Sequence, residues 1–172
     1  MLTGRYAWRS RLQNGVLDGY VPPLIAADRL TVPALLKQHG YRTAAYGKWH
    51  LGWTMINTNG QPAYQGSATE TNWATILVGT NANGTYVTNV LDGPLAHGFD
   101  YFFGVSQNFK NDSADAIKAY IENNCIQGIP TWNGAPPQAG VSCVGPGVAD
   151  WDQQRMGENY LNKSLGYIDS HV

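Results

Sequence analysis

Apolar and polar positions alternate in clear blocks along the chain, and the first block predicts a helix that begins after residue 31. Thr31 suits the N-cap position, and Pro33 falls in the first turn, where its missing N–H costs nothing. Residues 34–36 (Ala-Leu-Leu) are expected to form the buried face. Gly40 then suits the left-handed residue that ends a helix. The pattern therefore predicts a short capped helix over residues 31–40.

The next block, residues 41–46, is short and lies between Gly40 and Gly47. Its composition and length predict a β-strand. A helix, a glycine, a strand and a second glycine in succession are typical of an α/β unit. In such folds ligands gather beyond the carboxyl ends of the strands.

The middle of the chain carries weaker patterns. Residues 1–28 are rich in Gly, Pro and Arg and predict a loop, and residues 55–95 predict long excursions or a small hairpin. The aromatic run 99–104 indicates a buried strand or turn. Residues 113–122 fit one short helix, and the Pro- and Gly-rich stretch 125–149 predicts loop.

The last block predicts a second helix. Asp150 and Gln153 have the spacing of a capping box. Apolar residues then recur at near-helical spacing and are expected to form one buried stripe: Met156, Tyr160, Leu161, Leu165 and Ile168. The predicted strands are too few to form a complete sheet, which indicates that the chain is part of a domain.

Composition narrows the class of protein. The chain has 172 residues, of which 43% are hydrophobic and 13% charged, so it can form a core. Its net charge of −1 and the lack of any Lys/Arg cluster argue against a nucleic-acid partner. No apolar run has the length of a membrane span, and the first residues lack the pattern of a signal peptide. Cys125 and Cys143 fit either a disulfide or two thiols, and the four histidines show no zinc-site spacing.

The most informative segment is Gly47–Gly52, which reads Gly-Lys-Trp-His-Leu-Gly. If the strand continues through it, Lys48 and His50 point the same way and Trp49 points to the opposite face. An ammonium and an imidazole side by side suit a tetrahedral oxyanion: the first neutralises charge and the second exchanges a proton with a hydroxyl. Spacing alone leaves a simpler interpretation open, in which the Lys-x-His is a solvated strand end and the tryptophan is core.

Several motifs in the right order resemble the sulfatase family. Residues 40–52 (GYRTAAYGKWHLG) resemble the second sulfatase signature, with Tyr46 where the family more often has a small aliphatic residue. Residues 2–5 (LTGR) resemble the end of the first signature, and residues 30–37 and 97–104 (HGFDYFFG) also fit the family. The resemblance is weakest over residues 55–92 and 125–149.

The resemblance implies an α/β fold of the alkaline-phosphatase type: a mixed sheet flanked by helices, with long loops. It also implies a formylglycine nucleophile and a calcium ion in the whole enzyme, and export from the cytoplasm. Lys48 would bind a sulfate oxygen, and His50 would hydrogen-bond a hydroxyl of the hydrated aldehyde. Asn108 falls near a sulfate-contacting position, as does Ser106, whereas Arg5 is expected to anchor the nucleophile's helix.

Some elements of the family are not found in residues 1–172. The Cys/Ser-x-Pro-Ser-Arg element, the calcium-binding carboxylates and the downstream histidine and lysine have no counterpart. We therefore expect an inner part of a single sulfatase catalytic domain that acts on small-molecule or glycan sulfate esters and is inactive alone. Two alternatives stay open: a phosphomonoesterase or phosphonate hydrolase of the same superfamily, and a non-catalytic protein that binds sulfated glycans.

Overall fold

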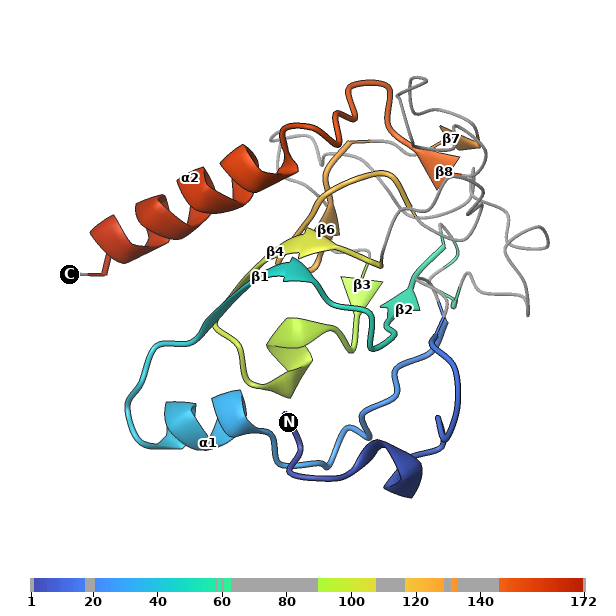
Figure 1. Cartoon of the computed structure of the whole chain (residues 1–172), viewed down its shortest axis with the longest axis vertical. Helices are drawn as coiled ribbons and strands as arrows, with labels where there is room; N and C mark the ends of the chain where they lie inside the picture. The colour runs from blue at the N-terminus through green and yellow to red at the C-terminus, as the bar shows by residue number, and fades with distance from the viewer. Residues whose placement is uncertain are drawn as a thin grey trace.

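The computed structural model describes residues 2–17, 21–57, 59, 61–62, 90–107, 117–128, 131–132 and 146–171 (Figure 1). Two residues singled out above, Asn108 and Cys143, lie outside these ranges. So do residues 63–89, the greater part of the predicted excursion, and residues 133–145.

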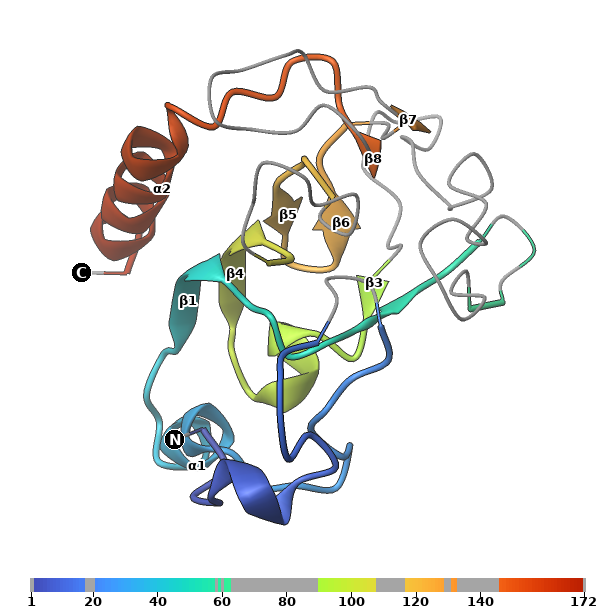
Figure 2. The same cartoon turned by 45° about the vertical axis from the view of Figure 1, so that its right-hand side comes forward.

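A four-stranded mixed sheet organises the described residues. Strands β1 (Ala44–Lys48) and β4 (Tyr101–Val105) run parallel, in a register that pairs Ala44 with Tyr101 and Lys48 with Val105. The short strands β5 (Ile121–Glu122) and β6 (Cys125–Ile126) continue the sheet antiparallel, in the order β1-β4-β5-β6. Helix α2 (Met156–Asp169) covers one face, while α1 (Val32–Gln38) and the 3₁₀ turn η3 (Pro94–His97) lie on the other side (Figures 1 and 2). The predicted α/β class is confirmed.

Strand β1 begins later than residues 41–46 predict. Thr43 holds the chain just before the strand: its N–H donates to Asp100 Oδ2 at 3.0 Å, and its hydroxyl donates to Gly98 O at 2.8 Å. The N–H of Thr43 is thus bonded to a side chain and not to a neighbouring strand. Regular pairing therefore starts at Ala44 and extends to Lys48.

Helix α1 has the predicted ends but not the predicted buried face. The Thr31 side chain accepts a hydrogen bond from Ala34 N at 3.3 Å, and Gly40 is left-handed with φ of 82°. Leu35 and Leu36, however, are 43% and 38% exposed. The helix meets the rest of the fold through its first turn, where Ala34 packs against Gly98, and through the ion pair of Lys37 with Asp100, so its leucines face outward.

Replacing Thr31 by valine should lower the free energy of unfolding by about 2 kcal/mol. The substitution removes both the cap and the buried bond that the hydroxyl donates to His97 O. Urea unfolding measures the change. Thr54→Val is the control, because it removes a solvent-exposed bond to Asp92, and it should cost less than about 1 kcal/mol. Equal effects of the two substitutions would contradict the assignment.

Residues 117–122 are extended, so the helix predicted over 113–122 is wrong for that part. Ile117, Lys118, Ala119 and Ile121 are all fully buried, and Lys118 forms an isolated parallel bridge with Gly147 in place of a helical turn. The chain then reverses through Asn123, whose φ is 56°, and Asn123 Oδ1 accepts a hydrogen bond from Phe102 N at 3.1 Å. Asparagine tolerates this left-handed conformation, and the Asn-Asn pair was the turn signal in the sequence.

The loop predicted over 125–149 also contains short strands. Besides β6, strands β7 (Thr131–Trp132) and β8 (Pro146–Gly147) pair antiparallel. At the ends of the predicted excursion over 55–95, β2 (Thr54–Met55) and β3 (Val90–Leu91) form a second two-stranded pair. Two-residue strands carry too little alternation to be found from sequence.

Helix α2 forms where predicted, but it starts at Met156 and the predicted capping box does not form. The N-cap residue is Arg155, which makes no side-chain cap bond. Upstream, Asp152 Oδ1 accepts a hydrogen bond from Gln154 N at 2.9 Å, and Trp151 is buried. This local turn takes residues 150–154 out of the helix.

The buried face of α2 also differs from the predicted stripe. Leu161, Leu165 and Ile168 are each about half exposed. Of the predicted stripe, Tyr160 does face the sheet, where it meets Phe103 edge to face. Tyr167 and Lys163, which were not in the stripe, face the sheet as well: Tyr167 stacks on Tyr101, and Lys163 pairs with Glu122 at 2.7 Å. Tyrosine rings and a lysine stem bury apolar area despite their polar ends, so hydrophobicity alone did not select this face.

Candidate functional site

The carboxyl end of β1 is shaped by two glycines that lie opposite each other. Gly47 has φ of 105° and pairs with Gly104 of β4. A Cβ atom on Gly104 would lie only 1.7 Å from Gly47 O. Only glycine at position 104 therefore permits the two strands to approach so closely at the residue before Lys48.

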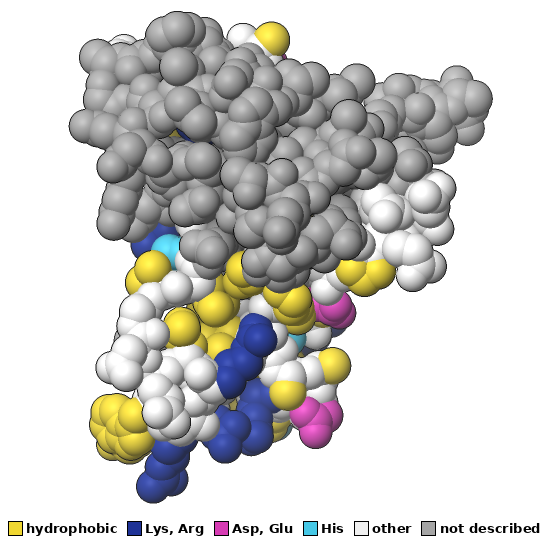
Figure 3. Space-filling view, turned by 90° about the vertical axis from the view of Figure 1, so that its right-hand side faces the viewer, with side chains coloured by type: hydrophobic (Ala, Val, Ile, Leu, Met, Phe, Trp, Pro, Cys, Tyr) yellow, Lys and Arg dark blue, Asp and Glu magenta, His cyan; other side chains and the backbone are white. Residues whose placement is uncertain are grey.

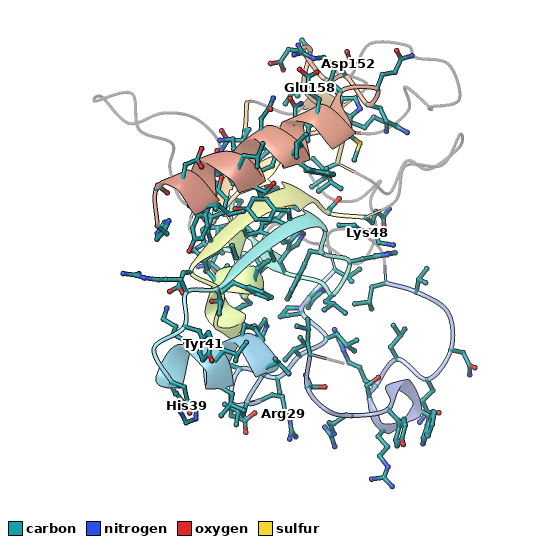
Figure 4. All side chains as sticks on the ribbon, turned by 60° about the vertical axis from the view of Figure 1, so that its left-hand side comes forward. Arg29, His39, Tyr41, Lys48, Asp152 and Glu158 are labelled. Atoms are coloured by element: carbon teal, nitrogen blue, oxygen red, sulfur yellow. The ribbon has the colours of Figure 1, made fainter. Side chains whose placement is uncertain are left out.

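Lys48 is the last residue of β1, and its side chain is exposed. Figure 4 shows it at the tip of the strand, at the other end from His39 and Tyr41 near α1. Within the described ranges the Lys48 side chain makes no hydrogen bond and no ion pair. Its ammonium group is thus available to an anion that approaches the strand tip.

Trp49, in contrast, belongs to the core. Its exposed fraction is 7%, and its Nε1 donates to Gly52 O at 2.9 Å. The indole stacks with His97 and meets Phe99 and Phe102 edge to face. This packing anchors the segment between Lys48 and His50 to the hydrophobic core.

His50 lies beyond the strand, so the alternation predicted through residue 50 stops at Lys48. The φ of His50 is 52°, a left-handed conformation that ends regular pairing, although its N–H still donates to Ser106 O at 2.9 Å. The ring is held by a second contact, in which Nε2 lies 2.6 Å from Leu17 O. Because a carbonyl only accepts, Nε2 carries the proton and Nδ1 of the neutral ring is left as an acceptor.

Two further polar residues follow β4 beside this tip. Ser106 and Gln107 are 1% and 6% exposed, and in the described part of the chain the Ser106 hydroxyl has no hydrogen-bond partner. Asn108, the predicted substrate-binding residue, comes next and lies outside the described residues. The carbonyl of Leu17 was missed by sequence reasoning, because a backbone atom in a loop leaves no signal in the side-chain pattern.

His97 stacks on the indole of Trp49 and so belongs to the packing behind the site. It is 4% exposed, and its Nε2 has no hydrogen-bond partner among the residues that the structure describes. Burial lowers the pKa of His97 below its ordinary value of 6.5, and the negative charge of Asp92 with a bond to the Asp92 backbone offsets part of that effect. The neutral imidazole is therefore the form that the fold accommodates.

The lowered pKa of His97 predicts a pH dependence of stability. Its contribution is fully present above about pH 6.5, and it is lost as the pH falls below that value, because the unfolded chain then binds the proton more readily. His97→Gln should flatten this slope in urea unfolding measured across the pH range. His39→Gln, at an exposed histidine, should keep it. An unchanged slope in the His97 variant would contradict the prediction.

Comparison with known proteins identifies the family. The model of the Sulfatase family matches residues 1–170. The chain belongs to the sulfatase family. It is 31% identical over 114 residues to human steryl-sulfatase, covering 61% of this chain and 14% of that protein. It is 40% identical over 52 residues to N-acetylgalactosamine-6-O-sulfatase of Bacteroides thetaiotaomicron, covering 30% of this chain and 10% of that protein.

A solved structure from the metabolism of glycosaminoglycans by Bacteroides thetaiotaomicron has the same fold. It superposes on 99% of this chain with a TM-score of 0.61 and 21% identity, while this chain covers 36% of it. The sulfatase fold predicted from the sequence is thus confirmed, and the chain spans well under half the length of these relatives.

The residues described here do not form the calcium site that the sulfatase family implies. No group of three or more His, Cys, Asp or Glu side chains comes together within the described ranges. Calcium prefers several carboxylate and other oxygen ligands, and the described residues bring no such group of carboxylates together. In the same ranges no helix is long and apolar enough to cross a bilayer.

Proposed function

We propose that this chain supplies the lysine and the histidine of a site that hydrolyses sulfate esters. The unpaired ammonium of Lys48 at the tip of β1 is the observation that carries the proposal. Sulfate esters bear one negative charge shared by three oxygens, and that charge shifts toward the leaving oxygen during cleavage. Because Lys48 ends a strand, its backbone is held in place, and its ammonium group can stabilise this charge where it develops.

His50 has the complementary role in this proposal. The Leu17 carbonyl fixes the ring and its tautomer, so that Nδ1 can accept a hydrogen bond from a hydroxyl near the sulfuryl group. In the family that hydroxyl belongs to a hydrated formylglycine. Asn108 is proposed as a further contact to the sulfate, from the chain that follows the buried Ser106 and Gln107.

The substrate class proposed is a sulfate ester of an aryl, steroid or sugar alcohol. The relatives named above share only the sulfate ester, since their alcohols are a steroid and an amino sugar. We place the chain within a single catalytic domain of an exported enzyme that also contains the formylglycine and calcium ligands.

The test uses a polypeptide that joins this chain to a nucleophile-bearing sulfatase segment. We expect hydrolysis of 4-nitrophenyl sulfate to exceed that of 4-nitrophenyl phosphate. The reverse preference would replace the proposal with a phosphomonoesterase. Retention of sulfated glycans with turnover of neither ester would favour a non-catalytic binding protein.

Residues 1–172 alone should give no turnover of 4-nitrophenyl sulfate, because no Cys or Ser in them has the formylglycine context. The measurement is release of 4-nitrophenol by the purified chain, with an identically purified Lys48→Gln chain as the control for contaminating enzyme. Turnover that is lost in the Lys48→Gln chain would refute the prediction.

A further inference from the structure

A cavity of about 500 Å³ lies against the N-terminal segment and is separate from the unpaired lysine at the tip of β1. Four arginines line it: Arg5, Arg9, Arg11 and Arg29. No acidic residue does. Figure 3 shows Lys and Arg side chains gathered among hydrophobic ones at this end of the molecule. The chain as a whole carries a net charge of −1, so this concentration of positive charge is local.

The four arginines differ in what they already bind. Arg11 Nη2 donates to Pro22 O and Pro23 O at 2.6 and 2.8 Å, so it ties the N-terminal segment to the next part of the chain. The side chains of Arg5, Arg9 and Arg29 make neither a hydrogen bond nor an ion pair in the described part of the chain. Three guanidinium groups that line one cavity without a partner are available to a bound anion.

The rest of the cavity is apolar. Leu24, Ile25 and Leu51 contribute to its lining, and Ile25 is only 8% exposed. At its edge Tyr6 stacks on Trp8 with ring centres 4.3 Å apart, although each residue is 62% exposed. A bare inorganic ion would gain nothing from these surfaces, whereas a flat apolar body would bury them.

We propose that this cavity binds an organic anion in which a compact oxyanion head, a sulfate or a carboxylate, is joined to an apolar ring body. Guanidinium groups match both heads with paired N–H donors. The volume suits a ligand of two to four rings. Leu51, which lines the cavity, directly follows His50, so the site adjoins the tip of β1 while using different charged groups.

Binding to the 172-residue chain can be measured by calorimetry and by tryptophan fluorescence, to which the exposed Trp8 contributes. The probes are 2-naphthyl sulfate, 2-naphthoate, 2-naphthol and inorganic sulfate. We expect one or both naphthyl anions to bind at least about tenfold more tightly than the neutral naphthol and the inorganic ion, and to weaken as salt is added. The stronger of the two naphthyl anions identifies the head group.

Variants separate this site from the strand tip. Arg9→Gln and Arg29→Gln should each weaken binding of the preferred anion by about tenfold or more. Arg42→Gln is the matched control, because Arg42 is exposed and does not line the cavity, and Lys48→Gln should also leave binding unchanged. Circular dichroism shows whether each variant is folded, and a folded variant of either arginine suffices for the test.

Three results would overturn the proposal: no binding of either naphthyl anion, equal binding of naphthol or inorganic sulfate, or loss of binding in Lys48→Gln but in neither arginine variant. The last result would assign the anion to the tip of β1. The proposed sulfatase site would then still hold, and the cavity would have no assigned ligand.

Discussion

Gly104→Ala is expected to lower the free energy of unfolding by at least about 3 kcal/mol, or to prevent folding altogether. The new methyl group would lie 1.7 Å from Gly47 O and 2.7 Å from Cζ of Phe102. Neither neighbour can yield cheaply, because one is backbone within the β1–β4 pair and the other is a buried core side chain. Urea or thermal unfolding followed by circular dichroism measures the loss.

Two other glycines serve as controls for this substitution. Gly166→Ala lies inside α2, where an added methyl group meets no atom within 4 Å, and it should stabilise the protein by about 0.5–1 kcal/mol. Gly47→Ala meets no atom either but has φ of 105°, so it should cost about 1–3 kcal/mol through strain alone. If Gly104→Ala proved no worse than Gly166→Ala, the close approach of the two strands would be disproved.

Lys48→Gln should reduce kcat for an aryl sulfate about 100- to 1000-fold in the polypeptide that includes a nucleophile-bearing segment. Glutamine keeps the length and a donor but removes the positive charge that faces the sulfuryl oxygens. Because the side chain is exposed and unpaired, the free energy of unfolding should change by less than about 0.5 kcal/mol. Steady-state kinetics with 4-nitrophenyl sulfate measures the first quantity and urea unfolding the second.

The matched control for Lys48→Gln is again Arg42→Gln, which also removes one exposed positive charge from the same stretch of chain. It should leave kcat unchanged. A comparable loss of kcat in both variants would mean that only the general field of positive charge matters. A loss of stability that accompanies the loss of kcat in Lys48→Gln would assign the lysine a structural role.

Local signals in the sequence predicted the features that local chemistry controls. The cap at Thr31, the left-handed Gly40 and the existence of the two helices and of strands β1 and β4 follow from short patterns of this kind. The candidate site was found by a motif, residues 47–52, whose glycines have positive φ at both ends.

Features controlled by distant partners could not be predicted in this way. The start of β1 is set by Asp100, which bonds Thr43 from 57 residues away. The leucines of α2 point outward because tyrosines of the same helix pack against the sheet. The left-handed φ of His50 follows from pairing with Ser106 and from the Leu17 carbonyl, neither of which leaves a pattern in the neighbouring sequence.

The bond between His50 and Leu17 has a consequence for how the imidazole is controlled. The carbonyl that fixes its proton comes from a segment 33 residues earlier, which Arg11 fastens to Pro22 and Pro23. If that segment lifts away, Nε2 loses its partner, the two tautomers come closer in energy, and the ring can rotate. Whether His50 Nδ1 is free to accept a proton thus depends on the position of a loop that contributes no side chain to the chemistry.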